Sequence, residues 1–124
     1  MAKQELGPLQ RKWVEALRSG EYRQTKGYLL MEGAYCCLGV ACLSIGLSPE
    51  HALGADVFDG SYVAVLPPLV KDGMRFRGWC GEFRNATDDE RYQSLADLND
   101  GGKTFDEIAD FVEAHSEAVF TEPA

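Results

Sequence analysis

Basic and aromatic side chains alternate between residues 18 and 35, and their types suit them to binding an anion. Arginine and lysine neutralise negative charge, and tyrosine rings offer stacking surfaces with a polar tip. The residues are Arg18, Tyr22, Arg23, Gln24, Lys26, Tyr28 and Tyr35. We expect this set to hold a nucleotide-like or phosphorylated ligand. The alternative is a polar edge that pairs with Glu15, Glu21 and Glu32.

Cysteines at positions 36, 37, 42 and 80 raise two further chemistries. Zinc prefers four tetrahedral ligands, and Cys-Cys-x4-Cys lacks the paired Cys-x2-Cys spacing. A catalytic thiol needs a base, but His51 falls in a polar turn and His115 on the buried stripe of a helix. Cys37, near a helix start, could have a lowered pKa. We expect packing thiols and no cofactor, with a small cysteine-dependent enzyme or a metal-binding structural protein as alternatives.

A third candidate is an acidic helix face near the C-terminus. The carboxylates that share it are Asp106, Asp110, Glu113 and Glu117. The segment from Leu95 to Glu113 has the spacing of a helix-turn-helix, yet its second helix is acidic and Lys103 is the nearest cation. DNA recognition is therefore disfavoured. We expect either a solvated face or a docking face for a protein with a basic surface.

The distribution of charge narrows the class of partner. Residues 1–46 contain six basic and four acidic residues, a net charge of +2. Because the whole chain carries −8, the remaining 78 residues carry −10. An acidic body disfavours general nucleic-acid binding. The sequence has no apolar run long enough to span a membrane, no signal-peptide pattern, and no spaced cysteine pairs. We expect a cytoplasmic protein and leave open whether its subunits associate.

The patterns predict an α+β fold in one domain, residues 1–124, with a frayed C-terminus. The expected elements are an N-terminal helix from Pro8 that Gly20 stops, a small and mostly antiparallel sheet with one buried helix among its strands, and a C-terminal helical hairpin. Strand-like runs at 27–31 and 34–36 flank a turn at 32–33. Residues 38–45 are apolar on nearly every side and should form the enclosed helix, capped by Gly46.

Further elements follow from turn and capping signals. We expect a helical turn at 48–53, a second hairpin around 59–60, and a strand at 74–80 after Pro67-Pro68. On that strand Met74, Phe76 and Gly78 should share one face, opposite Arg75, Arg77 and Trp79. Capping boxes at 87–90 and 104–107 should open two helices. The first should bury Tyr92, Leu95 and Ala96, and the second Phe105, Ile108, Phe111, Val112 and Val119.

Three motifs resemble a group of small uncharacterised proteins encoded by tailed bacteriophages and prophages. They are LRSGEYRQTKGYL at 17–29, YCCLGVAC at 35–42 and LADLNDGGKTFDEIAD at 95–110. The resemblance implies a phage origin and carries no reaction. Small acidic phage proteins of this type resemble accessory factors that block a host enzyme or immune complex, or that sequester a signalling nucleotide. We therefore expect a non-enzymatic counter-defence protein in the host cytoplasm.

Overall fold

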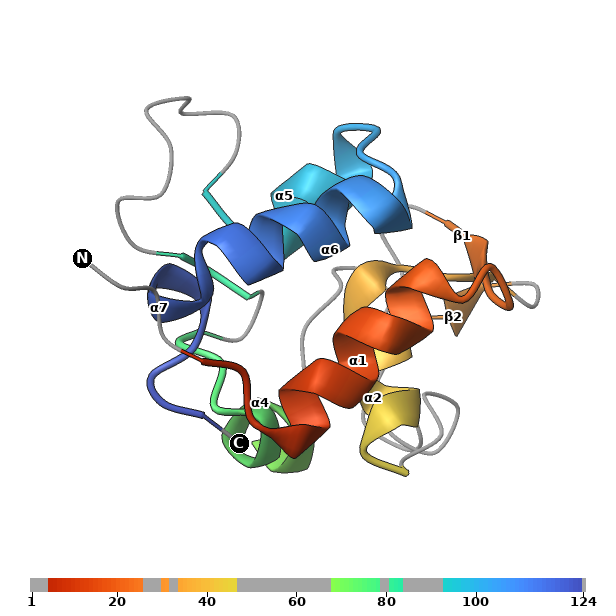
Figure 1. The fold of residues 1–124 in the computed structure, drawn as a ribbon. Coiled ribbons are helices and arrows are strands. Elements are labelled where there is room, and N and C mark those ends of the chain that lie inside the picture. Colours follow the sequence, from red (N-terminus) through yellow and green to blue (C-terminus); the bar gives the residue numbers. More distant parts are fainter. Residues whose placement is uncertain are drawn as a thin grey trace.

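A computed structural model of the chain describes residues 5–25, 30–31, 34–46, 68–78, 81–83 and 93–123. Within these ranges the fold is a mixed α+β arrangement of short helices, with a very small sheet at one edge of the molecule (Figure 1). Helix α1 contacts both α2 and α6, as the ribbon in Figure 1 shows. The helical turn expected at 48–53 and the hairpin expected around 59–60 lie outside the described residues.

Helix α1 (Pro8–Arg18) forms where the apolar spacing predicts it. Proline fits its first position because that residue's missing N–H would have no partner there. The apolar stripe of Trp13, Val14 and Leu17 is buried. After the helix, Gly20 has a φ of +76°, a backbone conformation that favours glycine. Both the helix and its glycine stop are confirmed.

The sheet has three strands, β1 (Arg23–Gln24), β2 (Leu30–Met31) and β3 (Ala34–Tyr35), with β3 in the centre. β2 and β3 pair antiparallel, which confirms the predicted hairpin. β1 pairs parallel with β3, however, so the expectation of a mostly antiparallel sheet is wrong. A hairpin pattern fixes the pairing of its own two strands only, and it does not say which free edge the preceding strand takes.

Helix α2 (Cys37–Ser44) is the enclosed helix that its composition predicts. Its residues from Cys37 to Cys42 are all buried, and Gly46 follows the helix with a φ of +87°. The indole Nε1 of Trp13 donates to the carbonyl oxygen of Cys37 over 2.9 Å. This bond joins α1 to the start of α2 inside the core.

Helix α4 (Pro68–Met74) corrects the predicted strand at 74–80. Proline is suited to the first turn of a helix as well as to the end of a strand, and here it opens a helix. Met74 closes that helix, Arg75 turns the chain with a φ of +65°, and Phe76 forms only an isolated bridge with Phe120. The predicted alternation of burial still holds at Met74 and Phe76, which are buried, and at Arg75, which is exposed.

The C-terminal hairpin consists of α5 (Leu95–Asp100) and α6 (Phe105–Ala114). The Thr104 capping box is confirmed, since Thr104 N donates to Glu107 Oε1 over 2.9 Å and Glu107 N donates to Thr104 Oγ1 over 3.1 Å. The capping box expected at 87–90 lies outside the described residues, and the helix that buries Leu95 is a separate, shorter one. It begins after Ser94, whose hydroxyl accepts the N–H of Asp97, because a serine closer to the apolar run satisfies that donor.

Two features complete the C-terminal region. The chain does not continue as one helix to Val119, because His115 adopts a non-helical ψ of 37° and a short α7 (Ser116–Val119) follows.

Three aromatic rings, those of Trp13, Phe76 and Phe120, pack together in the core with centroids 5.2 to 6.1 Å apart. Gln10 is fully buried nearby and donates to the carbonyl oxygens of Met74 and Glu122. α1 is thereby joined to α4 and to the C-terminal segment.

Candidate functional site

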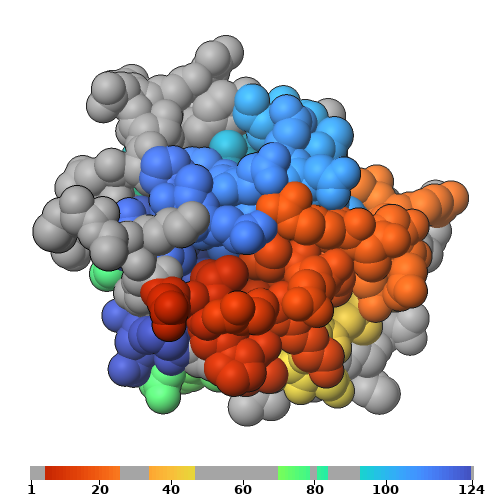
Figure 2. All heavy atoms as spheres, viewed as in Figure 1, coloured from red at the N-terminus to blue at the C-terminus, as the bar shows by residue number. Residues whose placement is uncertain are grey.

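Two sets of charges that the sequence separates meet at the contact between α1 and α6. Arg18 Nη2 donates to Asp110 Oδ1 over 2.8 Å and also forms an ion pair with Glu113. These hydrogen bonds, chiefly the one that Arg18 donates to Glu113 and then the one to Asp110, raise the pKa of Arg18 above its ordinary value. The space-filling view in Figure 2 shows α1 and α6 side by side on one face. Arg18 therefore faces the acidic helix rather than an empty anion pocket.

The other described members of the basic set also have intramolecular roles. The rings of Tyr22 and Tyr35 pack edge to face, with centroids 5.7 Å apart. Gln24 Nε2 donates to Asn99 Oδ1 over 2.9 Å and to the carbonyl oxygen of Lys103 over 2.7 Å. Arg23 is exposed. Lys26 and Tyr28 lie outside the described residues.

Asn99 is the buried centre of this polar edge. It is fully shielded from solvent, and its Oδ1 accepts from the N–H of Cys37 as well as from Gln24. Its Nδ2 donates to the carbonyl oxygen of Thr25 over 2.6 Å. One side chain thus joins α5, the start of α2 and the end of β1. A buried amide with this many partners has a structural role, because removing it would leave buried polar groups unpaired.

A small hollow of about 190 Å³ borders the same network. Gln24, Asn99, Gly102 and Lys103 line it. Lys103 is half-buried, and Gly102 has a φ of +101°. The hollow is too small for a nucleotide, since ligand pockets usually measure roughly 300–1,000 Å³.

The four carboxylates expected on one acidic helix face lie on two helices and differ in surroundings. Asp106 and Glu117 are exposed, the first on α6 and the second on α7. Asp110 keeps 71% of its side chain exposed and Glu113 keeps 44%, although both pair with Arg18. The face is therefore acidic and wet even where it is paired.

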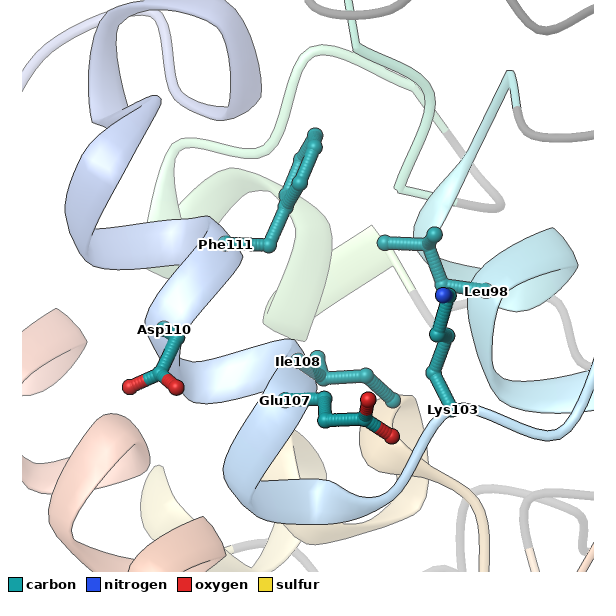
Figure 3. Close-up of a pocket in the computed structure, with 6 residues that line it drawn as sticks. All are labelled: Leu98, Lys103, Glu107, Ile108, Asp110 and Phe111. Carbon is teal, nitrogen blue, oxygen red and sulfur yellow. The ribbon is translucent and has the colours of Figure 1, made fainter.

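Beside this face lies a larger cleft of about 380 Å³ between α5 and α6. Its lining residues are Leu98, Lys103, Glu107, Ile108, Asp110 and Phe111. In Figure 3, Leu98 and Phe111 border the gap from opposite sides, while Asp110 points away from it. The walls are apolar and the charged groups lie at the rim. This composition suits a ligand with an apolar body and a polar or charged neighbour.

The sequence did not indicate this cleft. Ile108 and Phe111 repeat at helical spacing, which predicts two core residues, and Ile108 is one. Phe111 is only partly buried; it packs on Phe83 and on the ring of His115, with both centroid distances 4.7 Å. A partly exposed phenylalanine on a helix that is otherwise correctly patterned has no signature in the sequence.

The rim carries one carboxylate with a well-defined charge state. The N–H of Thr104 donates to Glu107, and this bond holds the pKa of Glu107 below its usual range. The carboxylate is fully ionised at neutral pH. Glu107 therefore contributes a fixed negative charge to the cleft as well as a helix cap.

The described cysteines are core residues, as their apolar neighbours predict. Cys36, Cys37 and Cys42 are reduced and buried. Burial raises the pKa of Cys36 and of Cys42 to about 12, and raises that of Cys37 well above its ordinary value. The expectation that a helix start could lower the pKa of Cys37 is wrong, because loss of solvent outweighs the backbone hydrogen bonds.

Zinc binding and thiol catalysis, the two chemistries that the cysteines raised, each involve a residue outside the described ranges, Cys80 and His51. The other histidine, His115, is half-buried at the end of α6 and packs on Phe111. Among the residues that the structure describes, no group of three or more histidine, cysteine or acidic side chains could hold a metal ion. None of the described helices is long and apolar enough to cross a membrane.

Comparison with known proteins gives one partial match. A family model described as a domain of unknown function (DUF8296) matches residues 4–51, the region that contains α1, the sheet and α2. No curated protein and no solved structure matches the chain. The similarity covers the basic and aromatic residues between 18 and 35, here called the basic edge, together with the buried cysteines of α2 and its start. It does not reach the cleft between α5 and α6.

Proposed function

We propose that this chain is a phage accessory protein that binds a host protein through the acidic face of α6 and α7, thereby inhibiting that protein. The observation that carries the proposal is the cleft between α5 and α6 lying beside exposed carboxylates in a chain of net charge −8. Its motifs resemble those of uncharacterised phage proteins, and small acidic phage proteins without enzymatic motifs resemble accessory factors that bind a host partner.

Protein binding fits this geometry better than nucleotide sequestration. Of the residues expected to hold an anion, Arg18 pairs with two carboxylates, and Gln24 binds Asn99 and a backbone oxygen. A phosphate would have to displace these partners and would meet Asp110 and Glu113 nearby. A basic protein surface meets no such repulsion from the acidic face.

The partner should dock by charge at the outset and by apolar contact at the end. Opposite charges speed encounter over about 10 Å at 0.1 M salt, and they are screened as salt rises. Apolar contact in the cleft would then slow dissociation, because desolvated anchors usually dominate interface energies. The resulting inhibition would arise from occupying the partner's surface.

The test uses two neutralised variants with the same change in charge. Asp106→Asn with Glu117→Gln alters the acidic face, and Glu15→Gln with Glu21→Gln alters exposed carboxylates on and just after α1. Each tagged protein is expressed in infected host cells, and the captured partner is then purified and its affinity measured over a salt series.

We expect the acidic-face variant to bind at least about fivefold more weakly, the α1 variant to bind like the unmodified chain, and both affinities to fall with salt. A partner that does not distinguish the variants, or that binds equally at low and high salt, would contradict the proposal. Absence of any partner that binds in purified form would contradict it as well.

A further inference from the structure

Apolar side chains from both α5 and α6 line the cleft. Leu98 from α5 and Ile108 from α6 are buried side chains that border it, and Phe111 is only partly buried beside them. A cleft of about 380 Å³ is near the lower end of the range for small-molecule pockets, roughly 300–1,000 Å³. One large apolar side chain and its backbone are of the right order of size.

The charges around the cleft restrict what can lie beside that side chain. Glu107 lines the rim and is ionised, whereas the exposed Asp106, at the neighbouring position on α6, is not among the lining residues. Asp110 is the second carboxylate among the lining residues, but it points away from the gap in Figure 3 and is already paired with Arg18. Lys103 is the one cation among the lining residues. Its charge already acts on Glu107 and helps to lower that carboxyl's pKa. Two carboxylates still outnumber one cation along the cleft, and the chain carries −8 in total, so a cationic group next to the anchor is favoured over an anionic one.

The same charges decide against two other occupants. A second copy of this chain would bring another −8 to an acidic rim, so its approach would be opposed. A phosphorylated ligand would place its anion beside Glu107. A segment of a different protein, with basic residues flanking an apolar one, meets neither penalty.

We propose that the cleft between α5 and α6 takes a single large apolar side chain of the partner, tryptophan, phenylalanine or leucine, flanked by lysine or arginine. This inference rests on the proposed function and specifies the partner's recognition sequence. The apolar side chain packs between Leu98 and Phe111, and a flanking cation pairs with Glu107. Such aromatic or aliphatic anchors beside charged rims are typical of the energetic centres of protein interfaces.

The probes are three blocked tripeptides, Lys-Trp-Lys, Glu-Trp-Glu and Lys-Ala-Lys, titrated into the full chain labelled with ¹⁵N. We expect saturable shifts of the backbone amides at 98, 103 and 107–111 with Lys-Trp-Lys. Glu-Trp-Glu tests the charge requirement and Lys-Ala-Lys tests the apolar one, so each should bind at least about fivefold more weakly. Equal shifts with all three peptides, or no saturable shift with Lys-Trp-Lys, would overturn the inference.

Two variants locate the site. Glu107→Gln removes the rim charge and retains a side-chain oxygen that can cap α6, because glutamine also serves in capping boxes. It should weaken Lys-Trp-Lys by about threefold or more and leave Glu-Trp-Glu no weaker. Glu15→Gln, at an exposed carboxylate of α1 that does not line the cleft, should change neither. Equal effects of the two substitutions would contradict the assignment of the cation to Glu107.

The outcomes separate this inference from the function on which it rests. If a host partner binds and responds to the acidic-face variant while Lys-Trp-Lys does not bind, the cleft is not the anchor pocket and the proposed function stands. If Lys-Trp-Lys binds as expected and no host partner exists, the pocket is correct and the proposed function fails.

Discussion

The basic edge at β1 and the acidic hairpin of α5 and α6 are both rich in polar side chains, yet folding treats them differently. At the edge, Gln24 and Asn99 bond to each other and to the backbone, and Arg18 reaches across to α6. The hairpin keeps exposed carboxylates beside an apolar cleft. Density of charged residues in a sequence therefore does not identify a binding surface. What identifies it is the polar and apolar surface that remains after intramolecular partners are formed.

The largest expected effect comes from removing the centre of the polar edge. Asn99→Ala leaves the buried N–H of Cys37 without its acceptor and breaks the bond to Gln24. We expect the free energy of unfolding to fall by about 2–4 kcal/mol, measured by urea denaturation. Glu21→Ala, at an exposed position just after α1, should change the free energy of unfolding by less than about 0.5 kcal/mol. A similar small loss for both variants would mean that the edge is not held by Asn99.

Alkaline pH should weaken the same region through its thiols. The pKa of Cys36 and of Cys42 is about 12 in the folded chain, above the ordinary value of 9.0 that applies on unfolding. Stability is therefore complete below about pH 9 and is lost as pH rises toward 12, because the unfolded thiols ionise first. At pH 10 the loss should be roughly 1 kcal/mol for each thiol, measured by urea denaturation.

Alkylation gives an independent measurement of this burial. Cys36, Cys37 and Cys42 should react slowly at pH 7.5 in the folded chain and rapidly in denaturant, with each site followed by peptide mass spectrometry. Rapid labelling of Cys37 in the folded chain, at the rate of an exposed thiol, would contradict its place in the core and restore the thiol-enzyme alternative.

The ion pairs between α1 and α6 should contribute less to the free energy of unfolding than Asn99 does. Arg18→Ala removes two partly exposed ion pairs, with Asp110 and Glu113, and should cost about 0.5–1 kcal/mol, with the cost falling at high salt. A double-mutant cycle with Asp110→Ala measures the coupling of that pair. No coupling energy at low salt would show that the pair does not join α1 to α6 in solution.

Local signals in the sequence predicted several elements correctly. The stripe of Trp13, Val14 and Leu17, the apolar run of α2 and the capping box at Thr104 each determine a helix from neighbouring residues alone. Where a signal permits two structures, prediction failed. Pro68 suits the end of a strand or the start of a helix, and the difference depends on residues far along the chain.

Long-range contacts account for what the sequence could not show about the site. Arg18 and Asp110 are 92 positions apart, and nothing in either neighbourhood pairs them. Gln24 and Asn99 are 75 apart, so the basic edge could not be recognised as a structural network. The acidic face was predictable because helical spacing places Asp106, Asp110 and Glu113 together. The cleft beside it depends on how α5 packs against α6.

The most direct test compares the two regions in one binding measurement. The affinity of the purified host partner is determined for Asp106→Asn with Glu107→Gln, and for Arg23→Ala with Lys26→Ala. We expect the first pair of substitutions to weaken binding at least about tenfold and the second to leave it within about twofold. Weakening by the second pair alone would place the binding surface on the basic edge and contradict the role of the acidic hairpin.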